Sequence, residues 1–153
     1  MEKNAILSKD RKYRYILWRI WDQTKPIVLF IGLNPSTADE GNDDRTISKC
    51  IGFAKRWECG GLYMANLFAF RATEPEDLLK APDPIGPEND EWIGKLLDKS
   101  NFVVGVWGNH GRLLNRGEMF LEKIPDLYYL KMNKSGQPAH PLYLSYDTTL
   151  KKF

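Results

Sequence analysis

The chain has 153 residues with a formal net charge of +2, and 42% of its residues are hydrophobic and 27% are charged. These values are typical of one globular domain with a sizeable core and exclude a disordered chain, so we expect a single domain over residues 1–153. No apolar run reaches the roughly 20 residues that a membrane span needs, and the N-terminal residues lack the apolar core of a signal peptide. We therefore expect a cytoplasmic protein with no membrane partner.

Neither the small net charge nor the two cysteines identifies what the protein binds or which reaction it performs. A net charge of +2 is too small to indicate a nucleic-acid-binding protein by itself. An enzyme that contacts a few phosphates needs no large basic excess, however. The spacing of Cys50 and Cys59 matches neither a disulfide framework nor a common metal motif, so both are expected to be reduced structural thiols. We predict no bound metal and no cofactor.

The first half of the chain reads as strand, strand, helix and strand. Residues 13–21 are rich in aromatic and β-branched residues and predict a strand, which a short connection would pair antiparallel with the next one as a sheet edge. The apolar run from Ile27 stops in the turn 32–36 and predicts a central buried strand. Apolar residues at helical spacing predict an amphipathic helix from Thr46 to Gly60. Residues 62–70 then predict a second parallel strand after a right-handed crossover.

The second half continues the alternation after a long loop. Four prolines between Arg71 and Asn89 predict a surface loop with at most one helical turn. The elements expected after it are a helix over residues 88–100, a third strand over 102–107, a helix over 112–123 and a short fourth strand over 127–130. The pattern favours a three-layer α/β/α domain with a mostly parallel sheet of about four strands plus an antiparallel N-terminal edge strand.

Polar residues cluster where each predicted parallel strand ends. They are Asn34-Pro-Ser after the first strand, Asn66 and Arg71 around the second, Gly108-Asn-His after the third and His140 after the fourth. Open α/β sheets bind ligands at the carboxyl ends of their strands, so these residues are expected to lie side by side around one site.

Four motifs resemble the uracil-DNA glycosylase superfamily in order and spacing. They are Gly32-Leu-Asn-Pro-Ser, Asn66 inside an apolar strand, Val104-Gly-Val-Trp-Gly-Asn-His and His140-Pro-Leu-Tyr-Leu-Ser. Nearly the whole chain also resembles a bacterial and phage family catalogued only as a domain of unknown function. Its members share Leu-Asn-Pro-Ser-Thr-Ala-Asp, Asn-Leu-Phe-Ala and His-Pro-Leu-Tyr-Leu. The first resemblance implies a uracil-DNA-glycosylase-like fold and recognition of a base in DNA.

The glycosylase resemblance implies a role for several positions. Asn34 matches the residue that positions the attacking water in the mismatch-specific branch of the superfamily, whereas the strongly active branch has an aspartate there. Asn66 matches the side chain that reads the flipped pyrimidine. His140 matches the histidine that stabilises charge on the departing base, and Leu144 matches the wedge that replaces the base in the stack. The chain departs from the motif at residues 142 and 143, although Ser145 remains for a phosphate contact.

The remaining expected substrate contacts are Gly32, Leu33, Pro35, Ser36, Phe68, Arg71, Asn109 and His110. Phe53 and Phe70 are alternatives to Phe68 as a stacking face, and Tyr143 is an alternative to Leu144 as the wedge. Asn34 has the simpler alternative of opening a turn through its side chain, and Asn66 that of a structural asparagine. Arg71 is expected to bind phosphate or to pair with Asp83 or Glu74.

An acidic loop follows the first turn. Asp39, Glu40, Asp43 and Asp44 are suited to binding Mg²⁺, to forming a solvated loop, or to capping the next helix through Asp44. Asp39 is the member retained as a candidate catalytic base.

Three functions stay open at this stage. The first is a glycosylase-like hydrolase acting on a base in DNA or in a nucleotide. The second is a non-catalytic binder of nucleic acid or a modified base, and the third is an enzyme or sensor for another small, nucleotide-like ligand.

Overall fold

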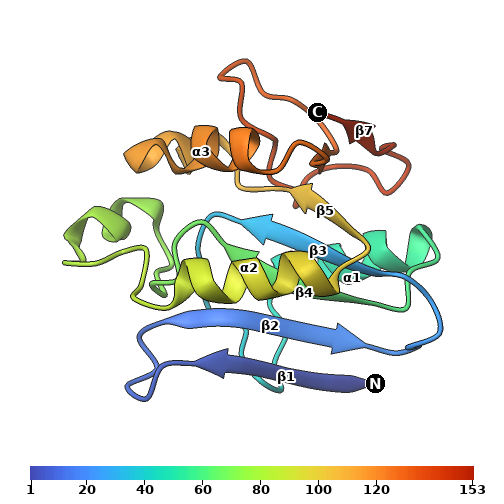
Figure 1. Ribbon diagram of the computed structural model, residues 1–153, viewed down its shortest axis with the longest axis horizontal. Helices are drawn as coiled ribbons and strands as arrows, with labels where there is room; N and C mark the ends of the chain where they lie inside the picture. Colours follow the sequence, from blue (N-terminus) through green and yellow to red (C-terminus); the bar gives the residue numbers. More distant parts are fainter.

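The computed structural model describes residues 1–153 and shows a seven-stranded mixed sheet with helices packed on it (Figure 1). Across the sheet the order is β1 (Glu2–Leu7), β2 (Arg14–Ile20), β4 (Gly61–Asn66), β3 (Ile27–Gly32), β5 (Phe102–Gly105), β6 (Tyr128–Tyr129) and β7 (Lys151–Lys152). The four strands from β4 to β6 run parallel. The α/β class and the four parallel strands predicted from the sequence are therefore confirmed.

The amino-terminal part of the sheet differs from the expectation. β2 pairs antiparallel with β4 rather than with β3, and β1 pairs with its other side, so β2 is not an edge strand. The connection after β2 wraps around the start of β4: the amides of Trp21 and Asp22 donate to the carbonyl of Gly60 at 2.8 and 2.9 Å, and the Gly60 amide donates to Pro26 at 2.7 Å. Gly60, which directly precedes β4, is therefore hydrogen-bonded both to the residues after β2 and to the residue before β3. These bonds fit the position of β4 between β2 and β3.

The helices cover both faces of the sheet (Figure 1). α1 (Arg45–Arg56) buries Ile47, Cys50 and Phe53 against one face. α2 (Asn89–Lys99) and α3 (Arg116–Lys123) pack on the opposite face. Both cysteines are free and buried, and burial raises the pKa of each thiol, which fits their predicted structural role. No helix combines the length and the apolar character needed to cross a membrane.

Two short 3₁₀ helices refine the predicted elements. η1 (Pro75–Lys80) is a 3₁₀ helix of six residues inside the proline-rich loop, longer than the single turn that was expected. η2 (Asn109–Asn115) replaces the start of the helix predicted over residues 112–123. The chain kinks there because Leu114 and Asn115 have positive φ angles of 51° and 56°, and α3 begins only at Arg116.

The carboxyl ends of the parallel strands meet at one edge of the sheet. In Figure 1 the arrowheads of β3 and β5 both point to the left. β4 is parallel to β3 and ends level with it, because Gly32 is in register with Asn66. The loops that follow these three strands consequently surround one region of the molecule.

Candidate ligand-binding site

A pocket of about 850 Å³ opens at this edge of the sheet. Its lining includes many of the residues predicted from the sequence, namely Gly32, Leu33, Asn34, Pro35, Ser36, Asn66, Asn109, His110 and His140. The volume lies within the range of about 300–1,000 Å³ that is usual for small-molecule sites. The structure thus brings together polar groups from turns that are up to about a hundred residues apart in the sequence.

Asn66 contributes a buried amide that has an uncommitted donor. The residue is 3% exposed, and its Nδ2 has no hydrogen-bond partner. Its main-chain carbonyl accepts a hydrogen bond of 2.9 Å from Asn89 Nδ2, which fixes the end of β4. A Cβ atom on Gly32 would lie only 2.8 Å from Asn66 Oδ1, so a glycine is needed beside this amide. Buried polar groups are rarely left unpaired, and the fold supplies no acceptor for this donor.

Asn34 is half-buried and is held by its amide nitrogen. Nδ2 donates to the carbonyls of Ala72 at 2.7 Å and Pro35 at 3.1 Å. This differs from an Asx-turn, in which the side-chain oxygen accepts from the following backbone. The Oδ1 atom accepts no hydrogen bond from the protein and remains available as an acceptor in the pocket.

His140 lies exposed at the pocket and is neutral near pH 7. Its Nδ1 accepts a hydrogen bond of 3.3 Å from the Leu142 amide, which assigns the proton of the neutral ring to Nε2. Although the imidazole is exposed, the surrounding protein displaces enough water to lower its pKa, and the carboxylate of Asp44 opposes this shift only partly. His140 therefore presents a neutral N–H donor.

Asn109 and His110 lie exposed on the rim of the pocket. Asn109 Oδ1 accepts hydrogen bonds from Asn133 Nδ2 at 3.0 Å and Ser135 Oγ at 2.6 Å. These contacts tie the turn after β5 to the turn that precedes His140. Asn109 therefore shapes the rim, while the side chain of His110 forms no hydrogen bond with the protein.

Arg14 lines the same pocket and is absent from the sequence-based set of site residues. It is the first residue of β2, is 2% exposed, and donates one hydrogen bond, from Nη1 to the carbonyl of Ala38 at 3.2 Å. Its Nε has no partner, and burial lowers the pKa of Arg14 to about 10. The sequence feature that could have identified Arg14 is an arginine inside a strand of aromatic and β-branched residues. An arginine is rarely buried there unless it has a partner.

Asp39, the candidate catalytic base, does not line the pocket. Its carboxylate accepts hydrogen bonds from the amides of Asn42 at 2.9 Å and Gly41 at 3.1 Å, and these bonds lower its pKa. A carboxylate with occupied lone pairs outside the pocket is a poor general base. Asp39 thus lies outside this pocket, where its carboxylate orders the acidic loop.

The other carboxylates of the acidic loop are also engaged. Glu40 pairs with Arg11 at 2.7 Å, and Asp43 pairs with the buried Arg19 at 2.7 Å. Asp44 caps α1, because its Oδ1 accepts from the Ile47 amide at 2.9 Å, as one of the sequence alternatives predicted. No three His, Cys, Asp or Glu side chains gather as metal ligands, so the Mg²⁺ alternative for this loop is not supported.

Three further expected contacts lie outside the pocket. Phe68 is 1% exposed within the core on the α2 side, because the chain after β4 turns inward. Leu144 packs against the core on the α1 side, and Ser145 Oγ accepts a hydrogen bond from the Asp147 amide. Tyr143, the alternative wedge, is 85% exposed. Phe68 and Leu144 thus pack in or against the core, whereas the side chain of Tyr143 projects into solvent.

Arg71 lines an adjoining pocket of about 520 Å³ together with Arg11 and Lys12. Ser36, Ala72 and Thr73 line both pockets, so the two are neighbours. Arg71 Nε donates to the carbonyl of Ser36 at 3.2 Å, and Arg71 forms no ion pair with Asp83 or Glu74. The phosphate alternative for Arg71 thus stays open as a prediction.

The fold and the site define an α/β protein with a pocket at the carboxyl edge of its parallel strands, to which several polar side chains contribute. The model of a family described as "Protein of unknown function (DUF1643)" matches residues 14–142. The chain belongs to this family, which confirms the closer of the two resemblances. No curated protein and no solved structure matches the chain. The glycosylase resemblance stays a prediction from four short motifs.

Proposed function

We propose that this protein recognises a nucleobase, in DNA or in a nucleotide, and hydrolyses its N-glycosidic bond. The observation that carries the proposal is the buried, unpartnered amide of Asn66 in a pocket that Asn34 and His140 also line. An asparagine amide offers one donor and one acceptor, which is the pattern needed to read the edge of a flat heterocycle. The glycosylase resemblance suggested the same three positions from the sequence.

The groups in the pocket suit the charges of this reaction. When the bond between the sugar C1′ and the base nitrogen breaks, positive character builds on the sugar and negative charge on the base. The neutral His140 Nε2–H is a donor for a base oxygen, and Asn34 Oδ1 can accept a hydrogen bond from the attacking water. The water oxygen bonds to C1′, and its proton ends on the departing base. Because asparagine cannot take a proton, we expect slow turnover.

A specific observation supports a second candidate, a binder without turnover. Asp44 is the carboxylate that lines the pocket, and both of its oxygens accept backbone amides, from Ile47 at 2.9 Å and Ala38 at 3.4 Å. The carboxylate that lines the pocket is thus engaged in capping the backbone, which makes it a weaker base for activating water. Recognition of a base needs only Asn66 and its neighbours, so it does not depend on this carboxylate.

The proposal is tested by incubating the protein with oligonucleotides and nucleotides that carry a panel of altered bases, followed by mass detection of free base. We expect slow release of one base. His140→Ala is expected to lower the rate by about 10²–10³-fold, the usual loss for a donor to developing charge. Lys99→Gln, at the end of α2 where β5 begins, is the control and should match the wild type.

The pH dependence of release gives a further check. His140 acts as a neutral donor, and burial lowers its pKa. The rate should therefore hold as the pH falls through about 6.5, where an ordinary histidine titrates, and decline only below it. Base-dependent binding without any free base would select the non-catalytic candidate, and neither binding nor release across the panel would end the proposal.

A further inference from the structure

Arg14 is a buried charge that the protein leaves almost unpaired. Nε and Nη2 bond to no protein atom, and Arg14 lines the pocket. Its single hydrogen bond goes to the neutral carbonyl of Ala38. Burying a charge is costly unless it is paired and hydrogen-bonded, so an uncompensated guanidinium needs a partner from outside the chain.

The other two buried arginines of the molecule show what a compensated site looks like. Arg19, in the same strand, pairs with Asp43 at 2.7 Å and donates to the carbonyl of Asp39 at 2.7 Å. Arg116 pairs with Asp90 at 2.7 Å and donates to the carbonyl of Leu67 at 2.7 Å. Each carries a carboxylate and at least one carbonyl. Arg14 has the carbonyl and lacks the carboxylate.

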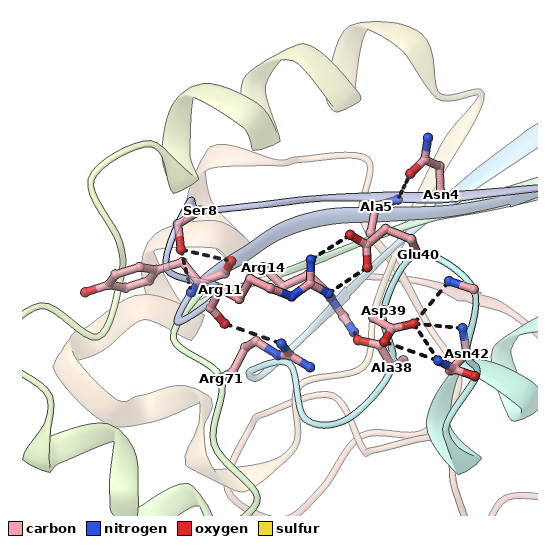
Figure 2. Close-up of polar contacts among 12 residues, drawn as sticks. Asn4, Ala5, Ser8, Arg11, Arg14, Ala38, Asp39, Glu40, Asn42 and Arg71 are labelled. Carbon is pink, nitrogen blue, oxygen red and sulfur yellow. Dashed lines mark hydrogen bonds and ion pairs between the residues drawn. The ribbon is translucent and has the colours of Figure 1, made fainter.

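The charged groups around Arg14 do not supply that carboxylate. Asp44 is its strongest acidic neighbour and Asp39 a weaker one, yet neither pairs with it, since Asp44 caps α1 and Asp39 bonds the amides of its own loop. Arg71 and Arg19 add positive charge. Figure 2 shows Arg11, Arg14 and Arg71 extending beside the loop that carries Ala38 and Glu40; Glu40 pairs only with Arg11.

We propose that Arg14 binds a phosphate group of the ligand, so that the pocket takes a nucleotide rather than a bare base. This inference rests on the proposed function, because the base of that nucleotide would be the group read by Asn66. The guanidinium is suited to phosphate, since its planar donors match two phosphate oxygens at once.

The start of α1 supports an anion at the same place. Arg45 and Thr46 open the helix and line the pocket with Arg14. Asp44 caps the third amide of this helix, that of Ile47, whereas the amides of Arg45 and Thr46 have no acceptor. Free amides and the helix dipole favour negative charge there. A buried side-chain cation and the amino terminus of a helix thus line the same pocket. A phosphate held there would lie in the same cavity as Asn66.

The test starts from inorganic phosphate, which needs no assumption about the base. The Arg14 Nε–H signal of the ¹⁵N-labelled protein is followed while phosphate replaces chloride at constant ionic strength. We expect this signal to shift in a saturable way, and the Arg19 Nε–H signal to stay in place. An Arg14 signal that does not respond to phosphate, or that responds no more than Arg19, would overturn the inference.

Variants then separate ligand binding from a structural role. Arg14→Met removes an unpaired buried charge and should leave the melting temperature equal or higher while abolishing saturable phosphate binding. Arg19→Met, the matched control, should lower the melting temperature because it strands Asp43. Should Arg14→Met not fold, Arg14→Gln serves, since it also removes the charge and the two-point contact. Phosphate binding that survives in the folded variant contradicts the inference.

The source of the phosphate and the proposed function are resolved by three probes: deoxyuridine, its 5′-monophosphate, and a trinucleotide with central deoxyuridine and no terminal phosphate. We expect at least a tenfold tighter binding of the monophosphate than of the nucleoside, lost in Arg14→Met. A gain seen only with the trinucleotide assigns the phosphate to a strand. Arg14-dependent phosphate binding, with no response to deoxyuridine or to any nucleoside of the altered-base panel, would keep this site and reject base recognition. A monophosphate and a trinucleotide that bind no tighter than the nucleoside would overturn the inference.

Discussion

At the scale of single residues, the pocket is distinguished by polar groups that the fold buries without satisfying. Three buried side-chain atoms lack partners, namely Arg14 Nε, Asn66 Nδ2 and Asn89 Oδ1, and two of them belong to pocket residues. Elsewhere, buried polar side chains such as Arg19 and Gln137 are bonded. Unpaired polar groups concentrated at one cavity favour a binding role there over a purely structural one.

Gly32 offers a precise way to disturb the Asn66 amide without deleting it. In Gly32→Ala the new Cβ would lie 2.8 Å from Asn66 Oδ1, so this amide must rotate or shift. We expect the protein to stay folded and nucleoside affinity to fall by about tenfold or more, because the amide no longer matches the base edge. Calorimetric titration measures this. Gly94→Ala on α2, where an added Cβ meets no atom within 4 Å, is the control; equal affinity in both variants would exclude Asn66 as the reading group.

Some residues of this site could be predicted from the sequence, and others could not. Asn66 could be predicted as a buried amide because it is a polar residue within an apolar strand. Arg14 carries the same signal, but its neighbour Arg19 carries it too, and only the structure shows that Arg19 is paired. The sequence could not show that the Asp39 carboxylate bonds amides two and three residues away. The directions of those amides depend on a loop conformation that composition does not encode.

At the scale of elements, the loop after β4 is held by donors from two helices. Asn89 of α2 and Arg116 of α3 both donate to the carbonyl of Leu67, at 3.2 and 2.7 Å. Arg116 is 3% exposed and also forms two hydrogen bonds to Asp90, which is half-exposed. These helices therefore position the end of β4, and with it Asn66, from the face of the sheet opposite α1.

Removing the hydrogen bonds of Arg116 to Leu67 and Asp90 should destabilise the fold. Arg116→Met loses the bonds to Leu67 and Asp90, and we expect the free energy of unfolding to fall by about 1–3 kcal/mol, the usual cost of breaking such buried bonds. Denaturant titration followed by tryptophan fluorescence measures the change. Lys95→Met, which removes the exposed pair with Glu91 on α2, should stay within about 1 kcal/mol of the wild type. An Arg116 variant as stable as this control would show that these hydrogen bonds are dispensable.

Elements were predictable where one face is strongly apolar. α1 presents its buried residues at helical spacing, and β3 is an unbroken apolar run. β1 was missed because half of its residues are exposed at the sheet edge, so no apolar stripe marks it. The position of β2 next to β4 depends on hydrogen bonds to Gly60, a long-range contact that local patterning does not contain.

At the scale of the whole molecule, the parallel strands explain why distant motifs share a site. β3, β4 and β5 end at one edge, and the turns that follow them, with the His140 segment, surround one cavity. Convergence of this kind follows from topology, so it was predictable once the strands were known to be parallel. The depth of the cavity and the burial of Arg14 were not, because they depend on how β2 and the loop after β3 pack.

The central claim is that this cavity holds a nucleobase against Asn66, and nuclear magnetic resonance tests it most directly. The ¹⁵N-labelled protein is titrated with nucleosides and their monophosphates, while the side-chain amide of Asn66, the backbone amide of Gly32 and the ring of His140 are followed. We expect at least one nucleotide to shift all three signals with a common dissociation constant. Signals that stay unmoved across the whole set, or shifts confined to the opposite edge of the sheet, would contradict the claim.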